Sequence, residues 1–293
     1  MADTLLSAVS RYADAHADVG GVARTPIPGL TLIRATAPSA LQYAISRPLA
    51  CLVVQGTKHV TMGDQAYTFS GGDSLLITAD VPTVSQVTRA SLGAPYLSLV
   101  LDLDLPLIAA LAVEMKAAAD ESDTAPVRVE PTDGEVAGAA LRLLRLLDRP
   151  ASVPVLQAQM VREMHYWLLA GRHGPAIRRL GPPDGHVQRV ARAVAVLRAE
   201  FAQVLPIERL AAVAGMSPSS FHQHFRAVTS LSPLQFQKRL RLIEARRLML
   251  AGESPANAAF AVGYESVPHF TREYGRLFGL SPARDVRAAR EAA

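Results

Sequence analysis

The chain has 293 residues, 49% of them hydrophobic, which is enough for two packed domains. A single cysteine, Cys51, excludes a disulfide framework or a multi-cysteine zinc site and fits a reducing cytoplasm, and no run of charge-free apolar residues predicts a signal peptide or membrane span. The net charge of +4 is uneven: residues 186–293 hold 15 Lys and Arg against 8 Asp and Glu, which indicates a polyanionic partner or simply solvated helix faces.

Residues from about 27 to 103 have the pattern of short strands. The segment "CLVVQGTKHVTMGDQAYTF" predicts three strands joined by turns at Gln55-Gly56 and Gly63-Asp64. A further turn is expected at 71–73, and "APYLSLVLDLD" predicts another strand. Short strands at near-regular spacing predict an antiparallel barrel or sandwich.

After Pro106 the pattern becomes helical. "LPLIAALAVEMKAA" and the segments 135–148 and 153–170 all have apolar residues at helical spacing. The last two segments form a helical hairpin that belongs either to a core or to a dimer seam. Its apolar faces contain Leu141, Leu144, Leu147, Leu156, Met160, Met164 and Leu168.

"GRHGPAIRRLGPPDG" is rich in Gly, Pro and Arg and marks a boundary. We therefore expect an α+β protein of two domains. The first, 1–170, is an antiparallel β-barrel with the helical hairpin; a linker covers 171–186; the second domain, 187–293, is all α.

The second domain contains a repeated phrase, and its first copy is "PIERLAAVAGMSPSSFHQHF". Gly215 ends a short helix where a left-handed residue is needed, and Ser217 and Pro218 predict the cap and first turn of the next helix. Phe221 and Phe225 are four residues apart and point into a core, so the polar residues between them face outward. This order is typical of a helix-turn-helix motif.

The second copy is "SPANAAFAVGYESVPHFTREY". Gly263 ends its short helix, Ser266 caps the next one, Pro268 falls in the first turn, and Phe270 and Tyr274 repeat the aromatic pair. In both copies an alanine lies four residues before the glycine, which lets the two helices pack closely. The repeat predicts two recognition helices in one protomer.

Between the copies, "PLQFQKRLRLIEARRLML" predicts one helix of roughly 27 Å. A helix of this length holds two recognition helices about one duplex turn, near 34 Å, apart. Most of its cations are expected to be solvated or paired within the helix, as Arg241 with Glu244, and one or two to reach DNA phosphates. These cations are Lys238, Arg239, Arg241, Arg246 and Arg247.

Residues 187–290 resemble the DNA-binding domain of the AraC/XylS family of bacterial transcription regulators. The motifs that carry the resemblance are "IERLAAVAGMSPSSFHQHF", "RLRLIEARRLML" and "AFAVGYESVPHFTREYGRLFGLSPARDVR". Two positions depart from the family pattern. Asp285 replaces a common aromatic residue, which we expect to loosen the final helix, and Pro268 replaces a polar or small residue, which we expect to reduce base contacts.

The resemblance implies which side chains contact DNA. Glutamine pairs with adenine and arginine with guanine in the major groove. Each histidine has the alternative of a surface or inter-helix hydrogen bond. The expected DNA-binding residues are Ser219, His222, Gln223, Arg226, Lys238, Val267, His269, Thr271, Arg272 and Arg276.

Residues 27–105 resemble the cupin-like sensing domain found in many members of this family, through Gln55-Gly56, Lys58, Val60, Gly63 and later positions. The resemblance implies a small-molecule effector site in the barrel and dimer contacts through the helices. The candidate effector-binding residues, which are equally compatible with a strand surface, are Tyr43, Arg47, Tyr67, Gln86 and Tyr96.

The hypothesis is a cytoplasmic transcription regulator, an activator, that binds duplex DNA and an effector, forms a homodimer and contacts RNA polymerase. Two alternatives are a cupin-type enzyme with an accessory DNA-binding domain and a regulator whose barrel only dimerises. A metal-dependent enzyme needs several converging histidines, but the barrel segment has only His59, and no Gly-x-Ser-x-Gly motif is present. We therefore expect no enzymatic activity, cofactor or metal.

Overall fold

A computed structural model describes residues 4–63, 65–116, 126–180 and 185–291. The chain divides into two compact units, one ending at Gln188 and the other beginning at Arg189. The division falls within α6 (His186–Ala199). Each unit is described by itself.

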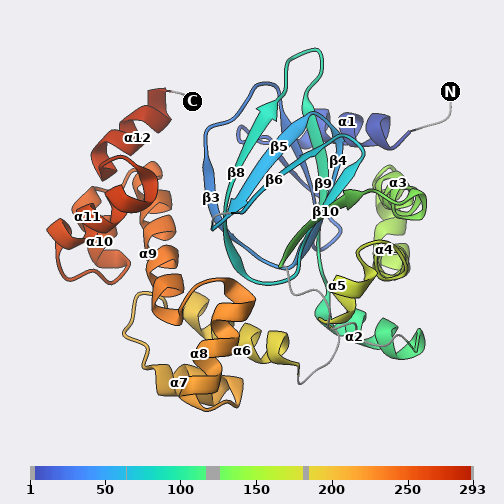
Figure 1. Ribbon diagram of the computed structural model, residues 1–293. Helices are drawn as coiled ribbons and strands as arrows, with labels where there is room; N and C mark the ends of the chain where they lie inside the picture. Colours follow the sequence, from blue (N-terminus) through green and yellow to red (C-terminus); the bar gives the residue numbers. More distant parts are fainter. Residues whose placement is uncertain (1–3, 64, 117–125, 181–184, 292–293) are drawn as a thin grey trace. The chain divides into compact units, whose positions relative to one another are not determined.

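The strands of the first unit form two antiparallel sheets (Figure 1). The order of the larger sheet is β1-β2-β9-β4-β7-β10, and that of the smaller is β3-β8-β5-β6. This confirms the antiparallel β-domain; Asp64, in one predicted turn, lies outside the described residues. The strands are β1 (Val22–Arg24), β2 (Leu30–Ala35), β3 (Gln42–Ser46), β4 (Leu49–Gln55), β5 (Thr57–Met62), β6 (Gln65–Ser70), β7 (Asp73–Ile77), β8 (Val81–Arg89), β9 (Tyr96–Asp102) and β10 (Val127–Pro131).

The larger sheet is buried on both faces. Along β9, Leu97, Leu99 and Leu101 enter the main hydrophobic core, whereas Tyr96 and Ser98 point to the opposite face. The term inner faces is used below for two surfaces. One is the face of the larger sheet that carries Tyr96 and Ser98, and the other is the face of the smaller sheet that carries Val60, Phe69 and Val87. Strand β6 of the smaller sheet contacts β4, β7 and β10 of the larger one.

The chain passes between the two sheets several times, and the tightest of the described crossings, between β4 and β5, is a glycine turn. Gly56 lies between β4 and β5 with φ = +83°, and a Cβ atom there would lie 2.6 Å from the carbonyl oxygen of Arg89 and 2.8 Å from the Cα of Tyr96. Only glycine fits a left-handed backbone this close to two other strands.

Helices cover the face of the larger sheet opposite the inner face. Residues of α1 (Leu5–His16), α3 (Gly134–Leu147) and α4 (Val153–Ala170) share one core with the sheet. The helical hairpin is confirmed as α3 and α4, and α2 (Leu105–Glu114) precedes it. Leu156 on the predicted apolar face is 40% exposed, so that face is only partly core.

The segment expected as a linker over 171–186 is partly structured. It contains α5 (Gly174–Arg178), and Ala176, Ile177 and Leu180 are each 1% exposed within the core of the first unit. The Gly and Pro residues that suggested a boundary instead bend the chain so that these three side chains pack. The linker expectation is therefore wrong for residues 171–180.

The second unit is entirely helical among its described residues (Figure 1). The two copies of the repeated phrase are two helix pairs separated by one 18-residue helix, as predicted. After α6 come α7 (Ile207–Ala214), α8 (Pro218–Thr229), α9 (Pro233–Leu250), α10 (Pro255–Ala261), α11 (Val267–Phe278) and α12 (Pro282–Glu291).

Aromatic side chains fill the core beneath both copies. Phe221 and Phe225 of α8 are fully buried and meet each other edge to face, with ring centroids 5.3 Å apart. Phe225 in turn meets Phe236 of α9 edge to face at 5.5 Å. Phe270 and Tyr274 of α11 are also fully buried. The i, i+4 pairs therefore fix which face of each recognition helix points outward.

Both predicted turn glycines adopt left-handed conformations, with φ = +63° at Gly215 and +86° at Gly263. Their surroundings differ. A Cβ at Gly263 would lie 2.0 Å from the carbonyl oxygen of Ala202, whereas one at Gly215 would only approach the end of the Arg189 side chain, at 3.4 Å. The second turn therefore packs directly against backbone.

Gly263→Ala is expected to destabilise the second unit by about 2–5 kcal/mol, because left-handed strain and a backbone clash add together. Gly279→Ala is the matched control: its φ is +75° but nothing lies within 4 Å of the added Cβ, so only the strain of about 1–2 kcal/mol remains. Hydrogen exchange of amides in 189–291 measures both. Equal losses in the two variants would show that the contact with Ala202 contributes nothing.

Candidate DNA-binding interface

The exposed face of α8 carries the polar residues predicted in the first copy. The Ser217 hydroxyl caps the helix by accepting a hydrogen bond from the Ser220 amide, and Pro218 occupies the first turn. Because Phe221 and Phe225 point inward, the four candidates form one solvent-exposed stripe at helical spacing. These are Ser219, His222, Gln223 and Arg226.

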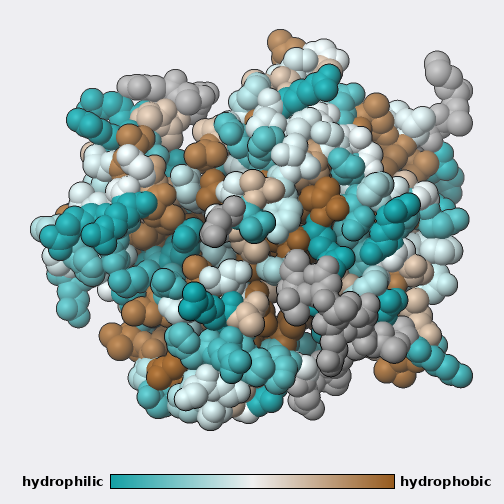
Figure 2. Space-filling view, viewed as in Figure 1, coloured by the Kyte–Doolittle hydropathy of each residue, from teal (hydrophilic) through white to brown (hydrophobic). Residues whose placement is uncertain are grey.

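The exposed face of α11 is built in the same way. Ser266 caps the helix, and buried Phe270 and Tyr274 set its orientation. His269, Arg272 and Arg276 are exposed, whereas Val267 and Thr271 are partly buried at the edge of this face. Figure 2 shows strongly hydrophilic side chains gathered over α11.

The recognition helices α8 and α11 carry three arginines on their exposed faces. Arg226, Arg272 and Arg276 make no ion pair with any of the described residues, so their guanidinium groups remain available. His269 differs, because its Nε2 lies 3.3 Å from a carboxylate oxygen of Glu273 one turn further along α11. The alternative of an internal contact therefore holds for this histidine.

Lys238, which is expected to contact DNA, also forms an ion pair inside the unit. Its Nζ donates to Glu273 at 2.6 Å, and the Tyr264 hydroxyl donates to the other oxygen of the same carboxylate at 2.8 Å. Burial by itself raises the pKa of Glu273, but the hydrogen bonds from Lys238 and Tyr264 outweigh it and hold that pKa below its usual value. Lys238 thus ties α9 to α11.

Arg241 joins the connection that precedes the first copy of the motif to the turn of the second copy. Its guanidinium donates to the carbonyls of Phe201, Ala202 and Gln203, in the connection between α6 and α7, and to that of Gly263 in the second turn, over 2.7–3.2 Å. Burial lowers the pKa of Arg241. The expected Arg241–Glu244 pair is wrong; Arg247 pairs with Glu244 at 2.6 Å.

Asp285 stabilises the final helix rather than loosening it, which corrects the expectation. Its carboxylate accepts hydrogen bonds from Arg246 Nε at 2.7 Å and the Tyr274 hydroxyl at 2.6 Å. Burial alone raises the pKa of Asp285, but these hydrogen bonds lower it further than burial raises it. A carboxylate thereby replaces an aromatic side chain as the link between α12, α9 and α11.

The effector candidates of the first unit do not lie together. Tyr96 is fully buried on the inner face, and Tyr67 pairs in register with Val60 on the same side. Tyr43 registers with Val84, away from these residues, and Gln86 donates to the carbonyl of Ser39. Arg47 is close enough to Asp102 to counteract the rise that burial causes in the pKa of that carboxyl.

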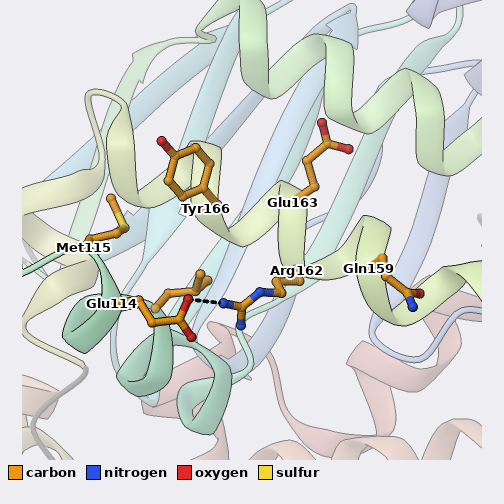
Figure 3. A pocket seen from close by; sticks show the side chains of 7 residues that line it. Glu114, Met115, Gln159, Arg162, Glu163 and Tyr166 are labelled. Atoms are coloured by element: carbon orange, nitrogen blue, oxygen red, sulfur yellow. Dashed lines mark hydrogen bonds and ion pairs between the residues drawn. The ribbon is translucent and has the colours of Figure 1, made fainter.

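A groove of about 630 Å³ lies between α2 and α4, outside the group of effector candidates. Figure 3 shows Arg162 of α4 reaching across it to Glu114 of α2, with Gln159 and Tyr166 beside them. Within the ranges that the structure describes, no three His, Cys, Asp or Glu side chains are grouped to hold a metal ion. No helix among the same residues is long and apolar enough to span a bilayer.

Two protein families match the sequence. The family described as AraC-type transcriptional regulator N-terminus matches residues 26–176, and a helix-turn-helix domain matches residues 210–288. The transcriptional activator RhaS of Escherichia fergusonii is 32% identical over 105 residues, and that of Klebsiella pneumoniae is 34% identical over 105. These matches cover 36% of this chain and 37% of each relative, so the chain spans about a third of the curated relatives it matches.

Solved structures of ToxT from Vibrio cholerae share the fold of the whole chain. An apo variant has a TM-score of 0.59 at 8% identity, covering 90% of this chain and 98% of ToxT. Wild-type ToxT with an unsaturated fatty acid bound has a TM-score of 0.52 at 9% identity, covering 88% and 94%. At these identities the likeness establishes the order of an N-terminal β-sheet domain and a C-terminal helical domain.

Asp285→Ala is expected to destabilise the second unit by about 3 kcal/mol, because Arg246 and Tyr274 lose a largely buried acceptor. The pKa of Asp285 is lowered in the folded state, so its stabilisation is complete above the ordinary aspartate pKa and disappears as the pH falls through the folded pKa. Hydrogen exchange of α11 and α12 in urea is therefore expected to give a difference in unfolding free energy between wild type and variant at pH 7, and this difference narrows as the pH falls below the ordinary aspartate pKa. Glu208→Ala, which removes an exposed acid, is the control and should leave the unfolding free energy unchanged. If the loss in Asp285→Ala does not depend on pH, the carboxylate of Asp285 does not stabilise the fold through its lowered pKa.

Arg241→Lys is expected to destabilise the contact between the two copies by about 2–3 kcal/mol, because an ammonium group cannot reproduce the fork that reaches four carbonyls. Hydrogen exchange should increase together at 201–203 and around Gly263. Arg247→Lys, in an exposed pair, is the matched control and should leave both segments unchanged. Increased exchange at only one of the two segments would show that Arg241 does not couple them.

Proposed function

Since the chain belongs to the family of AraC-type transcriptional regulators, we propose that it is a sequence-specific DNA-binding regulator whose N-terminal unit responds to a small effector. The observation that carries the proposal is the pair of capped helices, α8 and α11, that expose polar side chains and unpaired arginines from one unit. A stripe of donors and cations on a helix is suited to base edges and phosphates in the major groove.

The two recognition helices enter successive major-groove segments on one face of the duplex. The 18-residue α9 connects them, and side chains on α9 hold both copies through Arg241 and the second copy through Lys238 and Arg246. Because most cations of α9 are engaged inside the unit, phosphate contacts come chiefly from the exposed arginines. The side chains that contact base edges are Gln223, Arg226 and Arg272, together with their neighbours on the same exposed helix faces.

The first unit supplies control. RhaS relatives are activators by name, and ToxT has been solved with a fatty acid bound, which supports an effector-responsive activator here. Val155 and Tyr166 on α4 are 68% and 38% exposed, which supports a homodimer formed through this helix. As an activator, the protein contacts RNA polymerase at its promoters, and it acts in the cytoplasm.

Arg272→Ala is expected to weaken binding to the operator by about 1–3 kcal/mol, or roughly 5–150-fold, and to relax the preference at one base pair. The operator is first recovered by selection from randomised duplexes, and affinities are then measured at fixed salt. Arg24→Ala, which removes an exposed cation from the other unit, is the matched control and should retain the base preference.

Three results would count against these assignments. A loss of affinity in Arg272→Ala that is equal on all sequences assigns this side chain to a phosphate rather than a base. A footprint over a single major-groove segment contradicts the use of two recognition helices. Failure of the wild-type protein to select any sequence contradicts the proposed function itself.

A further inference from the structure

A polar cluster lies between the otherwise apolar inner faces of the first unit. Lys58 on β5 registers with Phe69 of β6 and Val87 of β8, which are 1% and 3% exposed. Side chains paired across neighbouring strands leave the sheet on the same face, so Lys58 extends from the inner face. A cation therefore projects toward the space between the two sheets.

The facing sheet offers hydroxyl groups. Tyr96 and Ser98 of β9 are 0% and 1% exposed, and their hydroxyls lie close to each other, but neither makes a hydrogen bond of good geometry to a nitrogen or oxygen within the part of the chain that the structure describes. Buried hydroxyl groups in native proteins are nearly always bonded, so two orphans side by side indicate a missing acceptor. Only the thiol of Cys51, a weak partner, lies beside both.

The ammonium group of Lys58 likewise lacks a counter-ion. Lys58 is partly buried, no carboxylate among the described residues forms an ion pair with it, and the Cys51 thiol is the one titratable side chain that contributes to its pKa shift. Burial lowers the pKa of Lys58 and raises the pKa of Cys51. Burying an unpaired cation costs stability, and such groups are concentrated at binding sites.

The three orphaned groups share one chemistry, because an ammonium and two hydroxyls all donate hydrogen bonds. A carboxylate has two oxygens that accept several hydrogen bonds and carries the charge that Lys58 lacks. The surrounding inner faces are apolar, with Val53, Val60 and Met62 each no more than 6% exposed.

We infer that the effector is an organic carboxylate with an apolar remainder, bound between the two sheets. Its carboxylate is the counter-ion of Lys58 and accepts from the hydroxyls of Tyr96 and Ser98. Its remainder packs on the apolar side chains of the inner faces, toward Tyr67. The inference rests on the proposed effector-sensing role and specifies the chemical class of the ligand.

Thermal unfolding of the full chain, followed by the fluorescence of Trp167, tests the assignment. Trp167 is the only tryptophan and lies on α4, so its signal reports the first unit alone. The probes are benzoate and hexanoate, each compared with its alcohol, benzyl alcohol or 1-hexanol, at equal millimolar concentration. At least one carboxylate is expected to raise the midpoint of the wild type by about 2 °C or more, and its alcohol not to do so.

The variants identify the site. Lys58→Met abolishes the shift, and Tyr96→Phe, which keeps the ring, weakens carboxylate binding by about tenfold. Arg89→Met, at an exposed cation on the same sheet, keeps the full shift. If Lys58→Met fails to fold, Tyr96→Phe decides the matter by itself.

Three outcomes overturn the inference: no carboxylate shifts the wild type, the alcohols shift it equally, or the shift survives in Tyr96→Phe and Lys58→Met. Operator binding by the wild type, measured on the same preparation, separates this failure from failure of the proposed function. A protein that selects its operator but ignores every carboxylate loses only the assigned ligand class. A protein that selects no DNA sequence loses the regulatory function.

Discussion

The side chains of α9 hold the second unit together, and Arg241 is the central one. A short helix-turn-helix motif has too little apolar surface to be held rigidly by burial alone, so its position depends on polar links to its neighbours. Arg241 provides such links at two places at once, since it donates to carbonyls that directly precede the first copy and to one in the turn of the second. The separation of the two recognition helices is thereby defined within a single chain.

The same requirement explains why the cations of the second unit fall into two groups. Lys238 and Arg246 face buried or half-buried acids, Glu273 and Asp285, and act as structural links. Arg226, Arg272 and Arg276, on the outer faces of α8 and α11, make no ion pair with the described residues and keep their hydrogen-bonding capacity for a partner. Only the exposed cations of this second group can bind a polyanionic partner, so they alone connect the basic composition of this unit to DNA binding.

The first unit balances stability against binding in its interior. One face of the larger sheet is packed with leucines against helices, and the buried polar side chains beside that core, His165 and the Ser74–His173 pair, are hydrogen-bonded. The opposite face accepts a lysine and unpaired hydroxyls between apolar side chains, an arrangement that packing alone does not favour. The sheet–helix layer is therefore the main source of stability in this unit, and the polar groups on the inner faces are the ones that we assign to a ligand.

The sequence by itself determined what depends on neighbours a few residues apart. The caps at Ser217 and Ser266, the left-handed glycines and the buried aromatic pairs follow from helical spacing and turn chemistry, and they identified both recognition helices. The tertiary structure decided which charges are engaged: Lys238 meets Glu273 35 residues away, and Arg246 meets Asp285 39 residues away. No local pattern encodes a pairing over that separation, because it arises only when the helices pack.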